Sequence, residues 1–166
     1  AGAEFVSDYF DFSIYIDADE AIDEQDETNN GVAAGVNLLV CEDDAFAGNQ
    51  SAATAPFIDV NAEQTDLYIC PGTEDWFCYD NLTAGDFNAT ATFALNPEDR
   101  TGSDLNIAVF AVDENRVTTA DLGSSVNLGD DASVDFTLDA DSDVCVRVFP
   151  LRPQGENSYT FQLTAP

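Results

Sequence analysis

Hydrophobic and polar residues alternate along much of the chain, most clearly in residues 5–17. One set of alternating positions in this segment is apolar and comprises Val6, Phe10, Phe12, Ile14 and Ile16. The other set carries Ser, Tyr and Asp. Because successive side chains of a β-strand point to opposite faces, this pattern predicts a long strand with one apolar face.

The rest of the chain predicts short strands separated by turns. We expect a second N-terminal strand at 32–40 and further strands at 66–70, 75–82, 86–95, 104–112, 124–128, 132–138, 143–149 and 157–164. Turn sequences such as Pro71-Gly72 and Gly129-Asp130 separate them, and no segment of useful length has a helical period. Many short strands with regular turns indicate an all-β sandwich or barrel.

The first 40 residues are expected to form an N-terminal strand or arm, and residues 41–166 the main domain. An acidic segment at 17–31 separates the two N-terminal strands and predicts either a solvated loop or a calcium loop without EF-hand spacing. The two strands suit a hairpin across that loop, or a separable arm. The strand at 5–17 is equally suited to completing the chain's own sandwich or to extending the sheet of a neighbouring molecule.

The charge of the chain is extreme. It has 33 Asp and Glu residues against 4 Lys and Arg, which gives a formal net charge of −29. This balance excludes nucleic acid and insertion into an anionic membrane as expected partners, because both attract basic surfaces. Self-repulsion of this size needs screening, and bound calcium or a very salty habitat would each supply it.

Four cysteines are present, and none forms a zinc-type pair. Two disulfide bonds are therefore expected, which predicts a secreted protein of the extracellular space or cell surface. The start at Ala1-Gly2-Ala3, without Met or a signal peptide, is expected of a mature exported chain.

Catalytic chemistry has little support in the sequence. The chain has no His and no Lys, so Ser-His-Asp, Cys-His and Schiff-base arrangements are excluded. With so many acids, a pair of carboxylates suited to glycoside hydrolysis carries no information. We therefore expect a protein that is not an enzyme.

Two further sets of residues are candidates for binding. Asp139, Asp141 and Asp143 alternate, so at a strand end the three carboxylates would share a face and could bind a cation, although such a run is also typical of a solvated turn. Trp76 and Phe77 are adjacent in a predicted strand and so lie on opposite faces. Core packing is expected of at least one of them, and a binding platform is the alternative.

Five motifs occur in the order typical of one known family. They are Asp75-Trp76-Phe77, Ala84-Gly85-Asp86, Ser103-Asp104-Leu105-Asn106-Ile107, Val144-Cys145-Val146-Arg147-Val148-Phe149 and Asn157-Ser158-Tyr159-Thr160-Phe161-Gln162-Leu163. In these motifs the chain from about Asp43 to Leu163 resembles the bacterial pre-peptidase C-terminal domains, which are related to collagenase collagen-binding domains. The resemblance implies an antiparallel, jelly-roll-like β-sandwich, with residues 5–17 as an additional strand.

The resemblance also implies a calcium site near the first turn. Asn49 and Asp75 match ligand positions of the family, and Asp43 and Asp44 are close enough in sequence to substitute for ligands that are missing at Ala47 and Gln50. For the disulfides it favours Cys41–Cys70 and Cys78–Cys145, with a Cys70–Cys78 hairpin bridge as the competing pairing.

The sequence is compatible with two functions. The first is a structural subunit of a filament-like or pilus-like assembly that self-associates through the strand at 5–17 and is stabilised by cations. The second is a calcium-dependent adhesion or substrate-binding module, or an export module of a secreted peptidase, with an extracellular polymer as partner.

Overall fold

The computed structural model describes residues 6–15, 31–41, 44–126 and 128–165, with side chains from residue 41 onward. The chain divides into two compact units, one spanning Glu4–Glu42 and one containing Asp43–Pro166. The sequence-based division lies between residues 40 and 41. Within the described residues, no helix is long and apolar enough to cross a membrane.

The N-terminal unit contains an antiparallel hairpin. Strand β1 (Val6–Tyr15) pairs with strand β2 (Gly31–Val40), in a register that runs from Val6 opposite Val40 to Tyr15 opposite Gly31. Of the alternatives open for the two N-terminal strands, the hairpin is therefore the one present, and the addition to the sandwich has two strands. Among the described strands β2 is the ladder partner of β1, so β1 does not complete the sandwich. Ile16 and the predicted loop at 17–30 lie outside the described residues.

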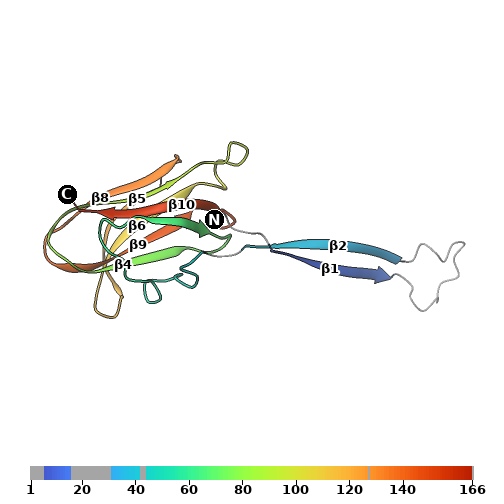
Figure 1. Ribbon diagram of the computed structural model, residues 1–166, viewed down its shortest axis with the longest axis horizontal. Helices are drawn as coiled ribbons and strands as arrows, with labels where there is room; N and C mark the ends of the chain where they lie inside the picture. The colour runs from blue at the N-terminus through green and yellow to red at the C-terminus, as the bar shows by residue number, and fades with distance from the viewer. Residues whose placement is uncertain (1–5, 16–30, 42–43, 127, 166) are drawn as a thin grey trace, which may run out of the picture. The chain divides into compact units, whose positions relative to one another are not determined.

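The second unit is a sandwich of two four-stranded sheets (Figure 1). One sheet has the order β3 (Gln64–Ile69), β10 (Asn157–Thr164), β5 (Gly85–Phe93) and β8 (Asp131–Leu138). The other has the order β4 (Asp75–Leu82), β9 (Ser142–Pro150), β6 (Leu105–Val112) and β7 (Thr118–Ser125). All neighbouring strands are antiparallel, which confirms the predicted all-β sandwich.

The residue pattern of each strand follows its place in a sheet. Edge strand β8 alternates strictly between exposed and buried residues, as expected of a strand with one face on the core and one in water. Central strand β6 reads LNIAVFAV and is buried at seven of its eight positions. Its outer face is therefore covered as well, which explains why its sequence is almost continuously apolar.

Aromatic rings join the two sheets. Phe77 on β4 is fully buried and stacks on Phe161 of β10, with ring centroids 4.9 Å apart. Phe46, which precedes the strands of the sandwich, packs edge-on against Phe77 at 5.6 Å. Burial of large rings supplies much of the hydrophobic free energy of a small sandwich. We therefore expect Phe77 to contribute strongly to the stability of the fold.

Strand β7 is the main difference from the sequence prediction. It was expected at 124–128 and spans Thr118–Ser125. The prediction was wrong because Val126 and Leu128 are apolar and were expected to be buried in a strand. In the structure both residues are about half exposed. The true strand is a polar edge strand that pairs on one side only, with β6, so its sequence carries almost no alternation.

A segment before the first sheet strand covers the free edge of β4. The amide of Trp76 donates to the carbonyl of Asn49 at 2.8 Å, and the amide of Cys78 donates to the carbonyl of Pro56 at 2.9 Å. The amide of Ile58 donates back to the carbonyl of Cys78 at 3.0 Å. These bonds satisfy backbone groups that an open edge would offer to another strand. We refer to residues 49–58 as the edge strap.

Candidate functional site

The outer face of strands β10, β5 and β8 carries a network of polar side chains centred on Asn88. The Asn88 amide donates to the Asp135 carboxylate and to the Ser133 hydroxyl, both at 2.8 Å. Thr90 donates to the Asn88 side-chain carbonyl at 2.6 Å. Because these residues lie opposite one another in the strand register, the network is fixed by the sheet itself.

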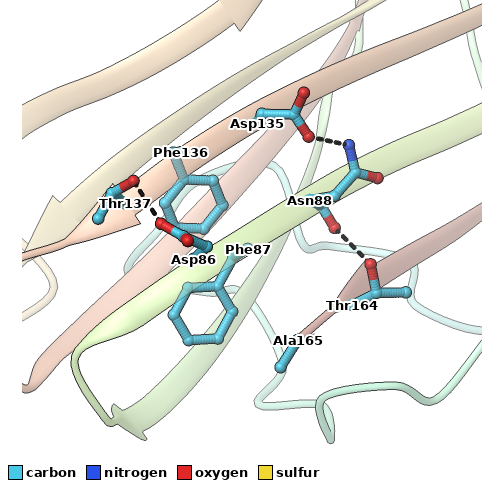
Figure 2. A pocket seen from close by; sticks show the side chains of 8 residues that line it. All are labelled: Asp86, Phe87, Asn88, Asp135, Phe136, Thr137, Thr164 and Ala165. Carbon is cyan, nitrogen blue, oxygen red and sulfur yellow. Dashed lines mark hydrogen bonds between the residues drawn. The ribbon is translucent and has the colours of Figure 1, made fainter.

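This network borders a shallow hollow of ≈ 390 Å³ (Figure 2). Thr137 donates to the Asp86 carboxylate at 2.7 Å, and Thr164 donates to the backbone carbonyl of Asn88 at 3.3 Å. The hollow is lined by Asp86, Phe87, Asn88, Asp135, Phe136, Thr137, Thr164 and Ala165.

The chemistry of the hollow suits binding. Hydroxyl, amide and carboxylate groups bonded to one another offer acceptors to a polyhydroxylated ligand. The chain has no His or Lys that would act as base or nucleophile beside them. Sequence reasoning missed this face, although polar residues at alternate positions of 86–90 and 133–137 were its visible signal.

The residues expected to bind calcium at the first turn are partly brought together. Asp75 and Asn49 are both buried, with about 1% of each residue exposed. Tyr159 donates its hydroxyl to Asp75 Oδ2 at 2.5 Å. In the amide orientation that satisfies its neighbours, Asn49 donates to Asp75 Oδ1 at 2.9 Å and to the carbonyl of Phe46 at 3.2 Å. Protein donors thus bind both oxygens of the Asp75 carboxylate.

Asp44 has a similar structural role. Its Oδ1 accepts from the Phe46 amide at 2.7 Å, and its Oδ2 accepts from the Tyr68 amide at 2.9 Å. Asp43 lies outside the described residues. In the described part of the chain, no group of three or more His, Cys, Asp or Glu residues is arranged to hold a metal ion. Asp44, Asn49 and Asp75 are bonded to protein groups in the structure, and calcium binding stays a prediction.

The second acidic cluster caps a turn. Asp143 Oδ1 accepts from the Asn81 amide at 2.8 Å, and Asp141 Oδ1 accepts from the Ala84 amide at 3.0 Å. Asp139 is exposed at the end of β8. The alternation of these acids therefore places two carboxylates on the β4–β5 turn, where they satisfy backbone amides.

Trp76 and Phe77 lie on opposite faces of β4, and each packs. Phe77 belongs to the core, whereas Trp76 stacks on Phe110 at 5.5 Å on the outer face of the sheet. The Trp76 indole donates to Glu74 at 2.8 Å, and Glu74 also forms an ion pair with Arg147. The partly buried Trp76 thus covers part of the outer face of this sheet.

All four cysteines are disulfide-bonded. The Cys78–Cys145 bond joins directly opposed residues of β4 and β9, with Cα atoms 4.1 Å apart. The preferred pairing of these two cysteines is therefore present, and the competing Cys70–Cys78 bridge is not. The bond is buried beneath Ala52 and Ala55 of the edge strap.

Two polar residues at the start of β6 are buried without full hydrogen bonding. Asp104 is 0% exposed, and its Oδ1 accepts from the Gly129 amide at 3.4 Å while its Oδ2 has no partner. Asn106 is 1% exposed, and neither polar atom of its side chain has a partner. Burial raises the pKa of the Asp104 carboxyl, against smaller opposing effects of the Gly129 amide and the Arg100 charge.

Replacing Asp104 by Asn is expected to stabilise the fold at pH 7 by about 1–3 kcal/mol, because it removes a buried negative charge that, among the described residues, only the Gly129 amide stabilises by a hydrogen bond. The raised pKa in the folded state means that protonation favours folding, so the wild type loses stability as pH rises through that pKa. The advantage of Asp104→Asn should therefore vanish near pH 3.

Urea unfolding at both pH values measures this, with exposed Asp139→Asn as the charge-matched control. An equal effect of the two substitutions at pH 7 would contradict the prediction.

No protein-family model matches the chain, and no curated protein matches it. Among solved structures, the pre-peptidase C-terminal domain of a collagenase from Bacillus anthracis matches with a TM-score of 0.50 and 13% identity. The match covers 66% of this chain and 94% of that domain. The sandwich has the pre-peptidase C-terminal fold. This likeness confirms the fold that the five motifs implied.

A second solved structure is more distant. The periplasmic inhibitor of g-type lysozyme from Aeromonas hydrophila matches with a TM-score of 0.44 and 12% identity, over 65% of this chain and 92% of that one. At 13% identity, the match to the collagenase domain shows the fold alone, and function must come from the residues of this chain.

Proposed function

We propose that this chain is an exported, non-catalytic β-domain that self-assembles into an extracellular filament through its N-terminal hairpin. The observation that carries this proposal is the separate two-stranded sheet of β1 and β2. Export is supported by the disulfide-bonded cysteines, which persist in oxidising compartments. Absence of catalysis is supported by the lack of His and Lys.

The hairpin needs more contacts than it has by itself. A two-stranded antiparallel ribbon is marginally stable in water, because it has two open edges and no second layer. The register places Phe10 opposite Val36 and Ile14 opposite Val32, so apolar residues of both strands fall in one row. A neighbouring molecule that covers this row or extends the ribbon would supply the missing burial. Because β1 already pairs with β2, the proposed assembly element is the whole hairpin, in place of β1 alone.

Charge sets a condition on this assembly. Molecules with a net charge of −29 repel one another, so contacts form only where cations or salt reduce the repulsion. Calcium at the contacts is part of the proposal. The chelator ethylenediaminetetraacetic acid should therefore shift the equilibrium toward monomer at constant ionic strength.

The test is sedimentation and negative-stain microscopy of the purified chain, with calcium and with chelator. We expect oligomers or filaments for the full chain and monomers for a chain that begins at Cys41. Phe12→Asp, in the apolar row, should weaken assembly at least tenfold, because it places a charge in the buried contact. Ser13→Asp adds the same charge at the neighbouring position of the other row and is the matched control.

Two outcomes would count against assembly. A monomer for the full chain in every condition would overturn the proposal. So would oligomers that persist when the hairpin is deleted while circular dichroism shows the sandwich still folded. Loss of assembly in both Phe12→Asp and Ser13→Asp would point to charge in general, and would contradict a specific role of the apolar row.

The hollow beside Asn88 favours a second function, a binding module for an extracellular polymer. Hydroxyl-rich ligands suit its acceptors, and Phe87 and Phe136 form part of its lining. Co-sedimentation of the full chain and of the hairpin deletion with insoluble cellulose, chitin or collagen distinguishes the two functions. Binding that survives deletion of the hairpin, by a chain that stays monomeric, would favour the module over the filament.

A further inference from the structure

Arg116 lies in a turn whose backbone is fixed by several hydrogen bonds. Its φ is 59°, in the left-handed region that a side chain other than Gly or Asn seldom adopts. The Arg116 amide donates to the Asp113 carbonyl at 2.8 Å, and the Asp113 amide donates to the Val117 carbonyl at 3.0 Å. The Asp113 carboxylate accepts from the amides of Asn115 and Val117, both at 2.9 Å. The turn thus keeps an arginine where glycine would be less strained.

The guanidinium of Arg116 is anchored by neutral groups. Its Nη1 donates to the carbonyl of Ala55 at 2.6 Å and to those of Ala52 and Ala53 at 3.3 Å. Its Cζ lies 4.2 Å from the ring centroid of Phe57. Within the described part of the chain, no ion pair joins Arg116 to a carboxylate, although the protein has 33 acids. The charge is thus held in place by carbonyl groups and a ring, with no carboxylate among its described partners.

Two exposed apolar residues accompany this charge. Phe57, under the guanidinium, is 48% exposed, and Val117, the next residue in the chain after Arg116, is 59% exposed. We call Phe57, Arg116 and Val117 the Arg116 patch. A fixed positive charge in contact with an exposed ring, on a molecule that is otherwise strongly acidic, attracts another acidic surface.

The other three arginines do not combine these features. Arg147 forms an ion pair with Glu74 and lies over the ring of Phe149, 4.4 Å from its centroid. Arg100 and Arg152 are exposed residues of turns. Arg152 follows exposed Leu151, but among the described residues no hydrogen bond or ion pair fixes its side chain. Arg116 therefore combines an unpaired charge, a fixed position and adjacent apolar surface.

The N-terminal hairpin has the complementary composition. Residues 4–42 contain many acids and no Lys or Arg, so all four arginines of the chain belong to the sandwich. In β1 the apolar positions Val6, Phe10, Phe12 and Ile14 share their alternation with one acid, Asp8. An apolar row that carries one carboxylate matches a patch of two exposed apolar groups around one guanidinium.

We propose that the Arg116 patch is the acceptor for the hairpin of a second copy of this chain, with Asp8 paired to Arg116 and the apolar row of β1 covering Phe57 and Val117. This inference rests on the proposed assembly and names its contact. A contact between two different surfaces is heterologous, so repetition generates an open filament or a ring. Anchoring of the guanidinium before contact lowers the entropic cost of the pair.

Charge substitutions test the pair by analytical sedimentation at fixed ionic strength. Arg116→Gln, which keeps amide donors for the strap carbonyls, and Asp8→Asn should each weaken self-association by about thirtyfold or more, as expected when one partner of a desolvated charge pair is removed. Arg116→Glu should abolish it, and combination with Asp8→Arg should restore at least part of it. Arg152→Glu makes the same charge change at an exposed turn and should have little effect. Circular dichroism melts confirm that each variant is folded.

The outcomes separate this inference from the proposed function. If hairpin deletion abolishes assembly while Arg116→Glu and Asp8→Asn leave it unchanged, the filament remains and the Arg116 contact is overturned. If Arg152→Glu weakens assembly as much as Arg116→Glu, the effect is one of net charge and the contact is likewise overturned. If the two charge reversals fail to compensate in a folded double variant, Asp8 is not the partner of Arg116. A monomeric full-length wild type would refute both proposals together.

Discussion

Replacing Cys78 and Cys145 together by alanine is expected to lower the free energy of unfolding by about 4 kcal/mol. The bond closes a loop of 67 residues, and chain entropy in the unfolded state predicts a stabilisation of this size for such a loop. The loss of buried sulfur contacts beneath the edge strap adds to the effect. Because small domains are stable by only about 5–15 kcal/mol, the variant should be close to unfolding at 37 °C.

Chemical denaturation under oxidising conditions measures this effect. Val146→Ala, at a fully buried position of the same strand, is the packing control and should cost distinctly less, since it removes core contacts but no cross-link. A double cysteine variant that unfolds at the same urea concentration as the wild type would show that the bond contributes no net stability. In that case strain in the bonded state would have to offset the entropic gain.

Replacing Phe77 by alanine is expected to cost about 3–5 kcal/mol, the range found for large aromatic side chains removed from cores. Phe77 is fully buried, stacks on Phe161 and receives the edge of Phe46, so its removal leaves a cavity that both sheets border. Phe57→Ala makes the identical chemical change at a side chain that is 48% exposed. It should cost less than about 1 kcal/mol.

Urea unfolding midpoints compare the two phenylalanine variants directly. Similar losses in both would contradict the assignment of the core to the interface of the two sheets. The Phe57 variant also serves the assembly question, because it removes part of the Arg116 patch while the fold should remain intact. A folded Phe57 variant with undiminished assembly would limit the contact to the charge pair.

The sandwich was predictable because alternation and turn residues are local signals. Strands such as β8 and β10 bury every second residue, so apolar and polar residues alternate in their sequences. Strand β7 was misplaced because an edge strand that packs weakly leaves no such record. The pairing of β1 with β2 was one of several alternatives, since a period of two does not say which strand lies alongside.

The site residues were less predictable than the fold, because a carboxylate in the sequence does not reveal its donors. Asn49 and Asp75 were predicted as calcium ligands and do lie in contact, but the Tyr159 hydroxyl that also binds Asp75 comes from the far end of the chain. Asp141 and Asp143 were predicted to bind a cation, and in the structure each accepts a hydrogen bond from an amide of a turn about 60 residues away. Arg116 drew no attention in the sequence, since its unpaired state depends on where all the acids lie.

The edge strap has a consequence for hydrogen exchange. The amides of Trp76 and Cys78 donate to carbonyls of the strap, so they exchange with solvent only when the strap detaches from β4. A segment held by a short row of backbone bonds opens more readily than a central strand of the sandwich. These two amides should therefore exchange by local opening, whereas the amides of β6 should exchange only when the whole sandwich unfolds.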